Sequence, residues 1–476
     1  MTQDPNEVVH NLSTTIVDED HVIVKESLLM VEKLLKQGPS AKRYHGVLCS
    51  SMDMLHALVN ATCRSFEILA RGSKETHQAL EDAVERAQKS TNILRMLAEP
   101  QKDRDVPRGE KVKMQMTACC GIVDQKGPAV LSMLLPYQND RIRNNCLVTI
   151  HNIFEGCLYQ KQHYDLAKEQ IRQAKGAEYM VNLLKNSNND KLSVILCDCL
   201  YQLAKLDKPT KDIIRINQGI ECLLHIVQHQ QYSNLLKEAF KLLQVLSTDD
   251  DLAKEQIRQA KGAEYMINLL KNSNNDQFSV ILCDCLYQLA KLDKPTKDVI
   301  RVNQGIECLL HIVRHQQYLD LIKDAFRLLQ VLSTDAECKQ LIHRNFGTDL
   351  IAEKLLEFLK QGNAETHRYL YLAASVIRNI SDNVQQFKNE DLVMHALIET
   401  LRFPSTPPPS NGREKATLNH QVCVLDTLGN ILIKMPRFKT KLLNDGMKLF
   451  IDILISCGGG NRGAMNLIEP VLLTIK

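Results

Sequence analysis

The sequence predicts an all-α protein built from tandem helical repeats. Residues 165–250 and 251–336 align without a gap, and these two copies differ at only twelve positions. An ungapped tandem copy must hold a whole number of structural units, because a partial unit would leave an apolar face uncovered. A weaker pattern recurs within each copy after about half its length, so each copy is predicted to contain two units.

Each predicted unit contains three helices in a fixed order. In the first copy a short helix ends before Gly176, and a second helix follows with Met180, Val181, Leu183 and Leu184 on one face. After a polar turn, residues 191–206 are apolar on nearly every side, which is typical of a helix packed between neighbours. About ten such units fit the chain, which predicts one continuous solenoid instead of several separate domains.

The remaining sequence extends this pattern on both sides of the two copies. Residues 1–13 are polar and are predicted to be a disordered lead-in, and residues 14–476 are predicted to form the repeat domain. Residues 17–38 are predicted to form its first long amphipathic helix. Residues 402–416 contain three consecutive prolines, so we expect an exposed, extended loop inserted between two helices.

The composition does not favour a strongly charged or membrane-embedded partner. The formal net charge is +3, so the charge balance predicts neither direct nucleic-acid binding nor binding to a membrane surface. The sequence has neither a signal-peptide pattern nor an apolar run of transmembrane length, so no membrane insertion is expected. The fifteen cysteines fall mostly in apolar helical segments, which favours reduced thiols in the cytoplasm or nucleus over a disulfide framework.

No pattern in the sequence indicates catalysis. The Cys-x-Cys sequence of each copy lacks a second ligand pair at zinc-site spacing. His225 and His229, repeated as His311 and His315, have the spacing of a metal pair, but neither a glutamate nor a third ligand accompanies them. The glycine-rich residues 458–463 lack the Gly-Lys-Ser/Thr of a phosphate-binding loop. We therefore expect no enzyme activity, metal or cofactor.

Short motifs along the chain resemble the armadillo repeats of the β-catenin family. These motifs are DEDHVIVKESLLMVEKLLK at 18–36, VTIHNI at 148–153, CDCLYQLA at 197–204, NLLKEAFKLLQVLS at 234–247, VIRNISD at 376–382, LGNILI at 428–433 and NLIEPVLL at 466–473. Their order and spacing agree with the family from about residue 14 to residue 476. The resemblance implies an armadillo-repeat, right-handed superhelical solenoid, in which the duplication adds one pair of repeats.

The resemblance also implies a scaffold whose third helices line a groove with a basic floor. In the family this groove holds extended acidic segments. The implied partners are a cadherin cytoplasmic tail in cell adhesion, a T-cell-factor-type transcription factor in Wnt signalling, and axin or adenomatous-polyposis-type scaffolds. The implied locations are the cytoplasm, the cell–cell junction and the nucleus. Binding of α-catenin is not implied, because most of the family's segment for it is missing from this sequence.

Ten residues stand at or beside groove positions of the family. Asparagine amides can pair with the backbone of an extended peptide, while lysines and arginines can select acidic side chains. Gln386 stands where the family has a peptide-binding lysine, which leaves room for ligands whose phosphates supply extra charge. The expected groove residues are His151, Asn152, Lys191, Lys211, Lys241, Lys297, Arg327, Asn379, Gln386 and Asn430.

Two other functions stay open at this point. A nuclear-import receptor of the importin-α kind is also built from armadillo repeats, but its groove uses tryptophan–asparagine arrays above acidic patches to hold basic peptides. This sequence contains no tryptophan. A generic helical-repeat scaffold with another partner is the third possibility. The charge of the ligand separates the first two functions, whereas the sequence does not separate adhesion from signalling.

Overall fold

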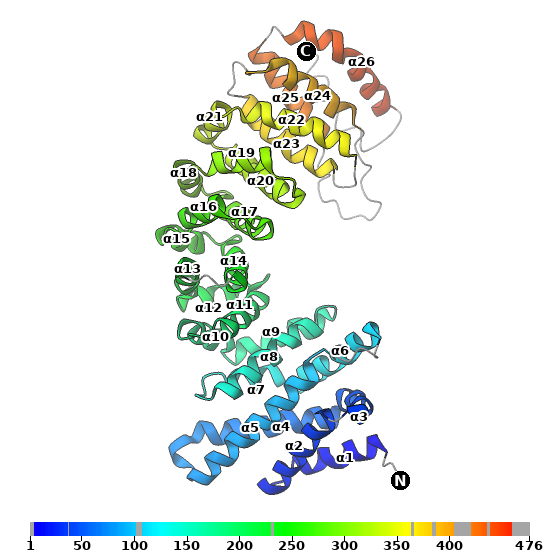
Figure 1. Ribbon diagram of the computed structural model, residues 1–476, viewed down its shortest axis with the longest axis vertical. Coiled ribbons are helices and arrows are strands. Elements are labelled where there is room, and N and C mark those ends of the chain that lie inside the picture. The colour runs from blue at the N-terminus through cyan, green and yellow to red at the C-terminus, as the bar shows by residue number, and fades with distance from the viewer. Residues whose placement is uncertain are drawn as a thin grey trace. The chain divides into compact units, whose positions relative to one another are not determined.

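The described part of the chain is entirely helical. The computed structural model describes residues 4–36, 38–100, 107–229, 233–362, 366–382, 387–403, 420–435 and 438–458. Within these ranges the chain forms 26 α-helices and one short 3-10 helix and contains no strand, so the predicted all-α class is confirmed (Figure 1). The chain divides into two compact units, Met1–Leu246 and Ser247–Lys476.

The first unit begins with long helices and ends with the shorter helices of the first copy. Its helices are α1 Pro5–Ile16, α2 His21–Lys36, α3 Gly38–Ser50, α4 Met52–Arg71, the 3-10 helix Gly72–Lys74, α5 His77–Ala98, α6 Arg108–Asp124, α7 Gly127–Met133, α8 Asp140–Gly156, α9 Lys161–Gln173, α10 Gly176–Lys185, α11 Asp190–Ala204, α12 Lys208–Ile216, α13 Gly219–His229 and α14 Ser233–Ser247.

The second unit contains the second copy and the helices that follow it. Its helices are α15 Asp251–Gln259, α16 Gly262–Asn272, α17 Asp276–Ala290, α18 Lys294–Val302, α19 Gly305–His315, α20 Leu319–Leu332, α21 Ala336–Arg344, α22 Gly347–Gln361, α23 Thr366–Ser381, α24 Glu390–Arg402, α25 His420–Lys434 and α26 Phe438–Gly458. Residues 404–416 of the predicted proline-rich loop lie outside the described residues.

Helix α1 shows that the prediction of a disordered lead-in at residues 1–13 is wrong for residues 5–13. The side chain of Asp4 caps the helix, and Pro5 occupies its first turn, where no N–H is needed. Val9 and Ile16 are buried, and α1 packs against α2 and α4. A helix needs only one apolar stripe to be held in place, so a segment that is polar on average can still fold.

A glycine allows the first and second helices of each repeat to meet closely. Gln304, which precedes Gly305, has a left-handed backbone conformation and reverses the chain direction between α18 and α19. A Cβ atom at Gly305 would lie 2.6 Å from Cγ2 of Ile300 and 2.9 Å from its carbonyl oxygen. Gly219 makes the equivalent approach to Ile214 in the first copy. The sharp turn therefore requires a residue without a side chain.

The third helices of successive repeats pack against one another within each unit. In the first unit α5 contacts α8, and α8 contacts α11. In the second unit α17 contacts α20, α20 contacts α23, and α23 contacts α25. Cys283, Leu286 and Leu289 of α17 are buried, as expected for a helix with neighbours on several sides. This stacking places side chains from different repeats next to one another.

The glycine turn generates a first prediction. Gly305→Ala should lower the free energy of unfolding by about 1–3 kcal/mol, because the added methyl group meets Ile300 and its backbone. Thermal unfolding followed by circular dichroism measures the effect. Gly109→Ala is the matched control, since a Cβ atom at Gly109 in the first turn of α6 meets no atom within 4 Å. Equal losses of stability in the two variants would contradict the proposed role of the turn.

Candidate peptide-binding surface

A short pattern around a side-chain amide recurs in seven third helices. Each amide occupies the same place in a short pattern: an apolar residue, any residue, the amide, and another apolar residue. The seven residues, called here the amide row, are Asn152 in α8, Gln202 in α11, Gln244 in α14, Gln288 in α17, Gln330 in α20, Asn379 in α23 and Asn430 in α25. The family resemblance predicts only the asparagines. The recurrence of the pattern at every repeat is the signal that identifies the glutamines.

The last two amides are oriented by hydrogen bonds to the preceding third helix. Nδ2 of Asn379 donates to Oγ of Ser333 at 3.0 Å and to the carbonyl oxygen of Gln330 at 3.3 Å. Nδ2 of Asn430 donates to Oγ of Ser381 at 3.0 Å. Neither Oδ1 atom accepts a hydrogen bond within the part of the chain that the structure describes. Both oxygens can therefore accept an N–H from a ligand.

These two amides line a concavity of about 600 Å³ in the second unit. Its walls come from the end of α20, from α21, and from the facing sides of α23 and α25. The side chain of Ile433 adds an apolar surface that is 76% exposed. The lining residues are Thr334, Lys339, Arg378, Asn379, Asp382, Leu425, Asp426, Gly429, Asn430 and Ile433. The concavity thus combines backbone-binding amides with charges of both signs.

Three basic side chains beside the amide row each pair with an aspartate on an adjacent third helix. The pairs are His151 Nδ1 with Asp198 at 2.7 Å, Arg327 Nη1 with Asp284 at 2.9 Å, and Arg378 Nη1 with Asp426 at 3.7 Å. The first pair lies in the first unit and the other two lie in the second. The resemblance implies a basic floor, but at these three places an aspartate of the protein offsets the basic side chain. A ligand carboxylate must compete with the protein's own aspartates there.

Arg327 is the most constrained of these cations. It also pairs with Asp324 of its own helix at 2.9 Å, and its guanidinium group lies 4.4 Å from the centre of the Tyr287 ring. Lys241, its counterpart in the first copy, is half-buried and pairs with Glu238 of α14 at 2.8 Å. The difference between Lys241 and Arg327 therefore changes the local contacts, because only arginine can stack on a ring while it binds carboxylates.

The other expected cations do not join the amide row. Lys297 is only 9% exposed, and its Nζ atom donates to Oγ1 of Thr334 at 2.7 Å, so this expected groove residue is already bound within the protein. Lys191 is exposed in the first turn of α11, and Lys211 is half-buried in α12. Gln386 lies outside the described residues.

Asn152 differs from the other expected asparagines. It is 7% exposed, and its Nδ2 atom is buried without a hydrogen-bond partner among the described residues. The backbone carbonyl oxygen of Asn152 accepts a hydrogen bond from Sγ of Cys119 at 3.4 Å. The side chain is therefore less accessible to a ligand than Asn379 or Asn430.

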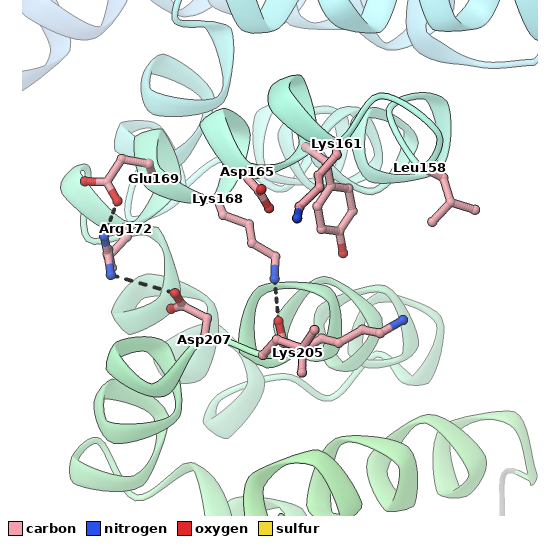
Figure 2. A pocket seen from close by; sticks show the side chains of 10 residues that line it. Leu158, Lys161, Asp165, Lys168, Glu169, Arg172, Lys205 and Asp207 are labelled. Carbon is pink, nitrogen blue, oxygen red and sulfur yellow. Dashed lines mark hydrogen bonds and ion pairs between the residues drawn. The ribbon is translucent and has the colours of Figure 1, made fainter. Parts of the chain in front are cut away.

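A second concavity, of about 470 Å³, lies in the first unit between α9 and the segment that follows α11 (Figure 2). Lys168 donates from Nζ to the carbonyl oxygen of Lys205 at 2.7 Å, and Arg172 lies between Glu169 and Asp207, 3.8 Å from the latter. The second copy repeats these contacts, since Lys254 donates to the carbonyl oxygen of Lys291 and Arg258 pairs with Asp293. The repetition indicates that they hold the repeat together. The sequence predicts none of these lining residues as a site.

Comparison with known proteins establishes the fold class alone. No family model and no curated protein matches this chain. An engineered protein solved by the Northeast Structural Genomics Consortium is 20% identical, covers 89% of this chain and 98% of its own, and has a TM-score of 0.58. A second engineered protein from this consortium is 21% identical, covers 57% of this chain and 96% of its own, and has a TM-score of 0.44. A third is 16% identical, covers 58% of this chain and 99% of its own, and has a TM-score of 0.43. The fold defines an all-α helical-repeat protein.

None of the described helices is both long enough and apolar enough to span a bilayer.

The His151–Asp198 pair generates a pH-dependent prediction. The hydrogen bond that His151 donates to Asp198 raises the pKa of His151, with smaller contributions from Glu155 and Glu238, although burial opposes the shift. A histidine whose pKa is higher in the folded state stabilises the fold below its unfolded value of about 6.5, and this stabilisation is lost as the pH rises through the folded pKa. His151→Gln should therefore destabilise the protein more at about pH 5.5 than at about pH 8.5.

Denaturant unfolding at both pH values measures this difference. Asp198→Asn should return the pKa of His151 towards its ordinary value in an NMR titration, because the charged partner is removed. A loss of stability in His151→Gln that is the same at both pH values would argue against a charged pair.

Proposed function

We propose that this protein is a β-catenin-like adaptor, a solenoid of about ten armadillo repeats that holds an extended peptide along its third helices. The amide row is the observation that carries the proposal. Packed helices lie roughly 8–10 Å apart, and an extended chain rises about 3.3 Å per residue. Accessible amides on adjacent third helices of one unit, such as Asn379 and Asn430, therefore meet an extended peptide at about every third residue. Asn379 and Asn430 offer their oxygens where the surface is hollowed.

Acidic segments are the ligands that we infer for this surface. Arg378 and Lys339 line the concavity, and Arg327 lies on the next third helix within the same unit. A carboxylate or phosphate on the ligand can replace Asp426 as the partner of Arg378, and a phosphate does so better because it carries more charge. The family resemblance suggests two partners that carry such acidic segments: a cadherin cytoplasmic tail and a T-cell-factor-type transcription factor.

A basic peptide is the second candidate ligand. The observation that favours it is the presence of Asp198, Asp284 and Asp426 beside the amide row, which a lysine or arginine of a ligand could bind in place of the protein's cations. This ligand would fit an import receptor of the importin-α kind. The two candidates require opposite responses to removal of an aspartate.

Calorimetric titration tests the proposal directly. The purified chain is titrated with an acidic cadherin-tail peptide, unphosphorylated and serine-phosphorylated, and with a basic import-signal peptide, each at low and high salt. We expect binding of the acidic peptides that weakens at high salt and strengthens on phosphorylation. Binding of the basic peptide alone would replace the adaptor by the import receptor. Binding of neither peptide would reject both functions.

The two half-buried asparagines Asn379 and Asn430 generate a third prediction. Asn379→Ala combined with Asn430→Ala should weaken binding of the acidic peptide about tenfold or more, because two acceptors for ligand N–H groups are lost. Asn268→Ala is the matched control, since Asn268 is exposed on the second helix α16 of the same unit. Circular dichroism verifies that the double variant is folded. Equal affinities of the double variant and the control would remove the amide row from the binding surface.

The Arg378–Asp426 pair generates a fourth prediction. Asp426→Asn should strengthen binding of the acidic peptide about threefold or more, because Arg378 no longer has a competing carboxylate within the protein. Arg378→Ala should weaken it by about tenfold. The same titrations with the basic peptide should show the reverse order. Weaker binding of the acidic peptide to Asp426→Asn would show that the aspartate, and not the arginine, contacts the ligand.

A further inference from the structure

Two cysteine thiols from different helices meet in the first unit. Cys120 lies in α6, and Cys157 directly follows α8 at its C-terminal end. Their Sγ atoms are 3.9 Å apart, although the residues are separated by 37 positions in the sequence. The peptide-binding surface makes no use of either thiol.

Gly156 explains why the two thiols come so close. A Cβ atom at this position would lie 2.5 Å from Sγ and 2.9 Å from Cβ of Cys119. The end of α8 can therefore approach α6 only because residue 156 lacks a side chain. This close approach of the two backbones places the thiol of Cys157 against that of Cys120, the neighbour of Cys119.

The two thiols differ in their environment. Cys120 is half-buried, whereas Cys157 is buried. The hydrogen bond from Cys157 holds the pKa of the Cys120 thiol below its usual range, with help from the nearby His163 and against the effects of burial and of Asp124. The same hydrogen bond, together with burial, raises the pKa of Cys157. Cys120 is therefore the thiol that loses its proton first and attacks first.

We propose that Cys120 and Cys157 form a modification site at which a hydroperoxide is reduced and a disulfide is made between α6 and the end of α8. The proposal rests on the contact between the two sulfur atoms and on the partial exposure of Cys120. It does not depend on peptide binding.

The chemistry takes place in two balanced steps. The Cys120 thiolate attacks one oxygen of hydrogen peroxide, the O–O bond breaks, and the departing hydroxide takes up a proton to become water, which leaves Cys120 as a sulfenic acid. The sulfur of Cys157 then attacks the sulfur of this sulfenic acid. The S–O bond breaks, and the hydroxyl group leaves with the Cys157 proton as a second water. One peroxide and two thiols thus become one disulfide and two waters.

Peptide mapping after oxidation tests this proposal. The reduced full-length protein is treated with a small excess of hydrogen peroxide at neutral pH, digested without reductant, and analysed by mass spectrometry. We expect a cross-linked pair of peptides that contains Cys120 and Cys157. Cys120 should react at least about fivefold faster than Cys63, which is also partly exposed but whose pKa is raised by burial.

Three variants separate the steps. Cys157→Ser should accumulate sulfenic acid at Cys120, which dimedone traps, and Cys120→Ser should leave Cys157 as a thiol. Cys119→Ser is the matched control and should still form the cross-link. A cross-link between Cys120 and Cys119, a sulfenic acid that persists in the unsubstituted protein, or a Cys120 that reacts no faster than Cys63 would each overturn the proposal. Peptide mapping of the unsubstituted protein tests the proposal even if a variant does not fold.

Discussion

Burial of the third helices between their neighbours is the constraint on which the rest of this structure depends. Within its own unit, each of α8, α20 and α23 contacts the third helices before and after it, so its apolar residues occupy most of its circumference. Only a narrow strip is left for polar residues. The amide row and the interhelical ion pairs lie in that strip, and their spacing from repeat to repeat is the spacing of the packed helices. The glycine turns support this arrangement by fitting the two shorter helices closely together.

The polar strip is built largely from compensated charges. A half-buried arginine or histidine loses part of its hydration, and an aspartate on the neighbouring helix replaces what is lost. His151, Arg327 and Arg378 all follow this rule. The affinity for a ligand therefore depends on how well a charged group of the ligand replaces the aspartate that already pairs with each of these basic side chains. A surface of this kind responds strongly to the charge of its ligand and to phosphorylation, because each new contact must exceed the one that it replaces.

The two near-identical copies show how the same local sequence can meet different surroundings. Their first helices make equivalent contacts, as Lys168 and Lys254 do with the backbone after the third helix. Their third helices differ, since Asp198 in α11 pairs with His151 of the preceding helix, whereas Asp284 in α17 pairs with Arg327 of the following one. Lys241 in the first copy has a partner in its own helix instead. Identity of sequence therefore does not imply identity of surface.

The sequence by itself determined the helical class and the order of the three helices in each repeat, because these depend on local periodicity and on glycine. The positions of Asn379 and Asn430 came from the resemblance of the sequence motifs to the family. Only the tertiary structure decided which charges remain available. Lys297 resembles any surface lysine in the sequence, yet its ammonium group bonds to Thr334 of a later turn. Residues 5–13 seemed too polar to fold, yet one apolar stripe meets two neighbouring helices. Side chains some 40 positions apart, such as Cys120 and Cys157, meet only through the packing of whole helices, and no local pattern encodes that contact.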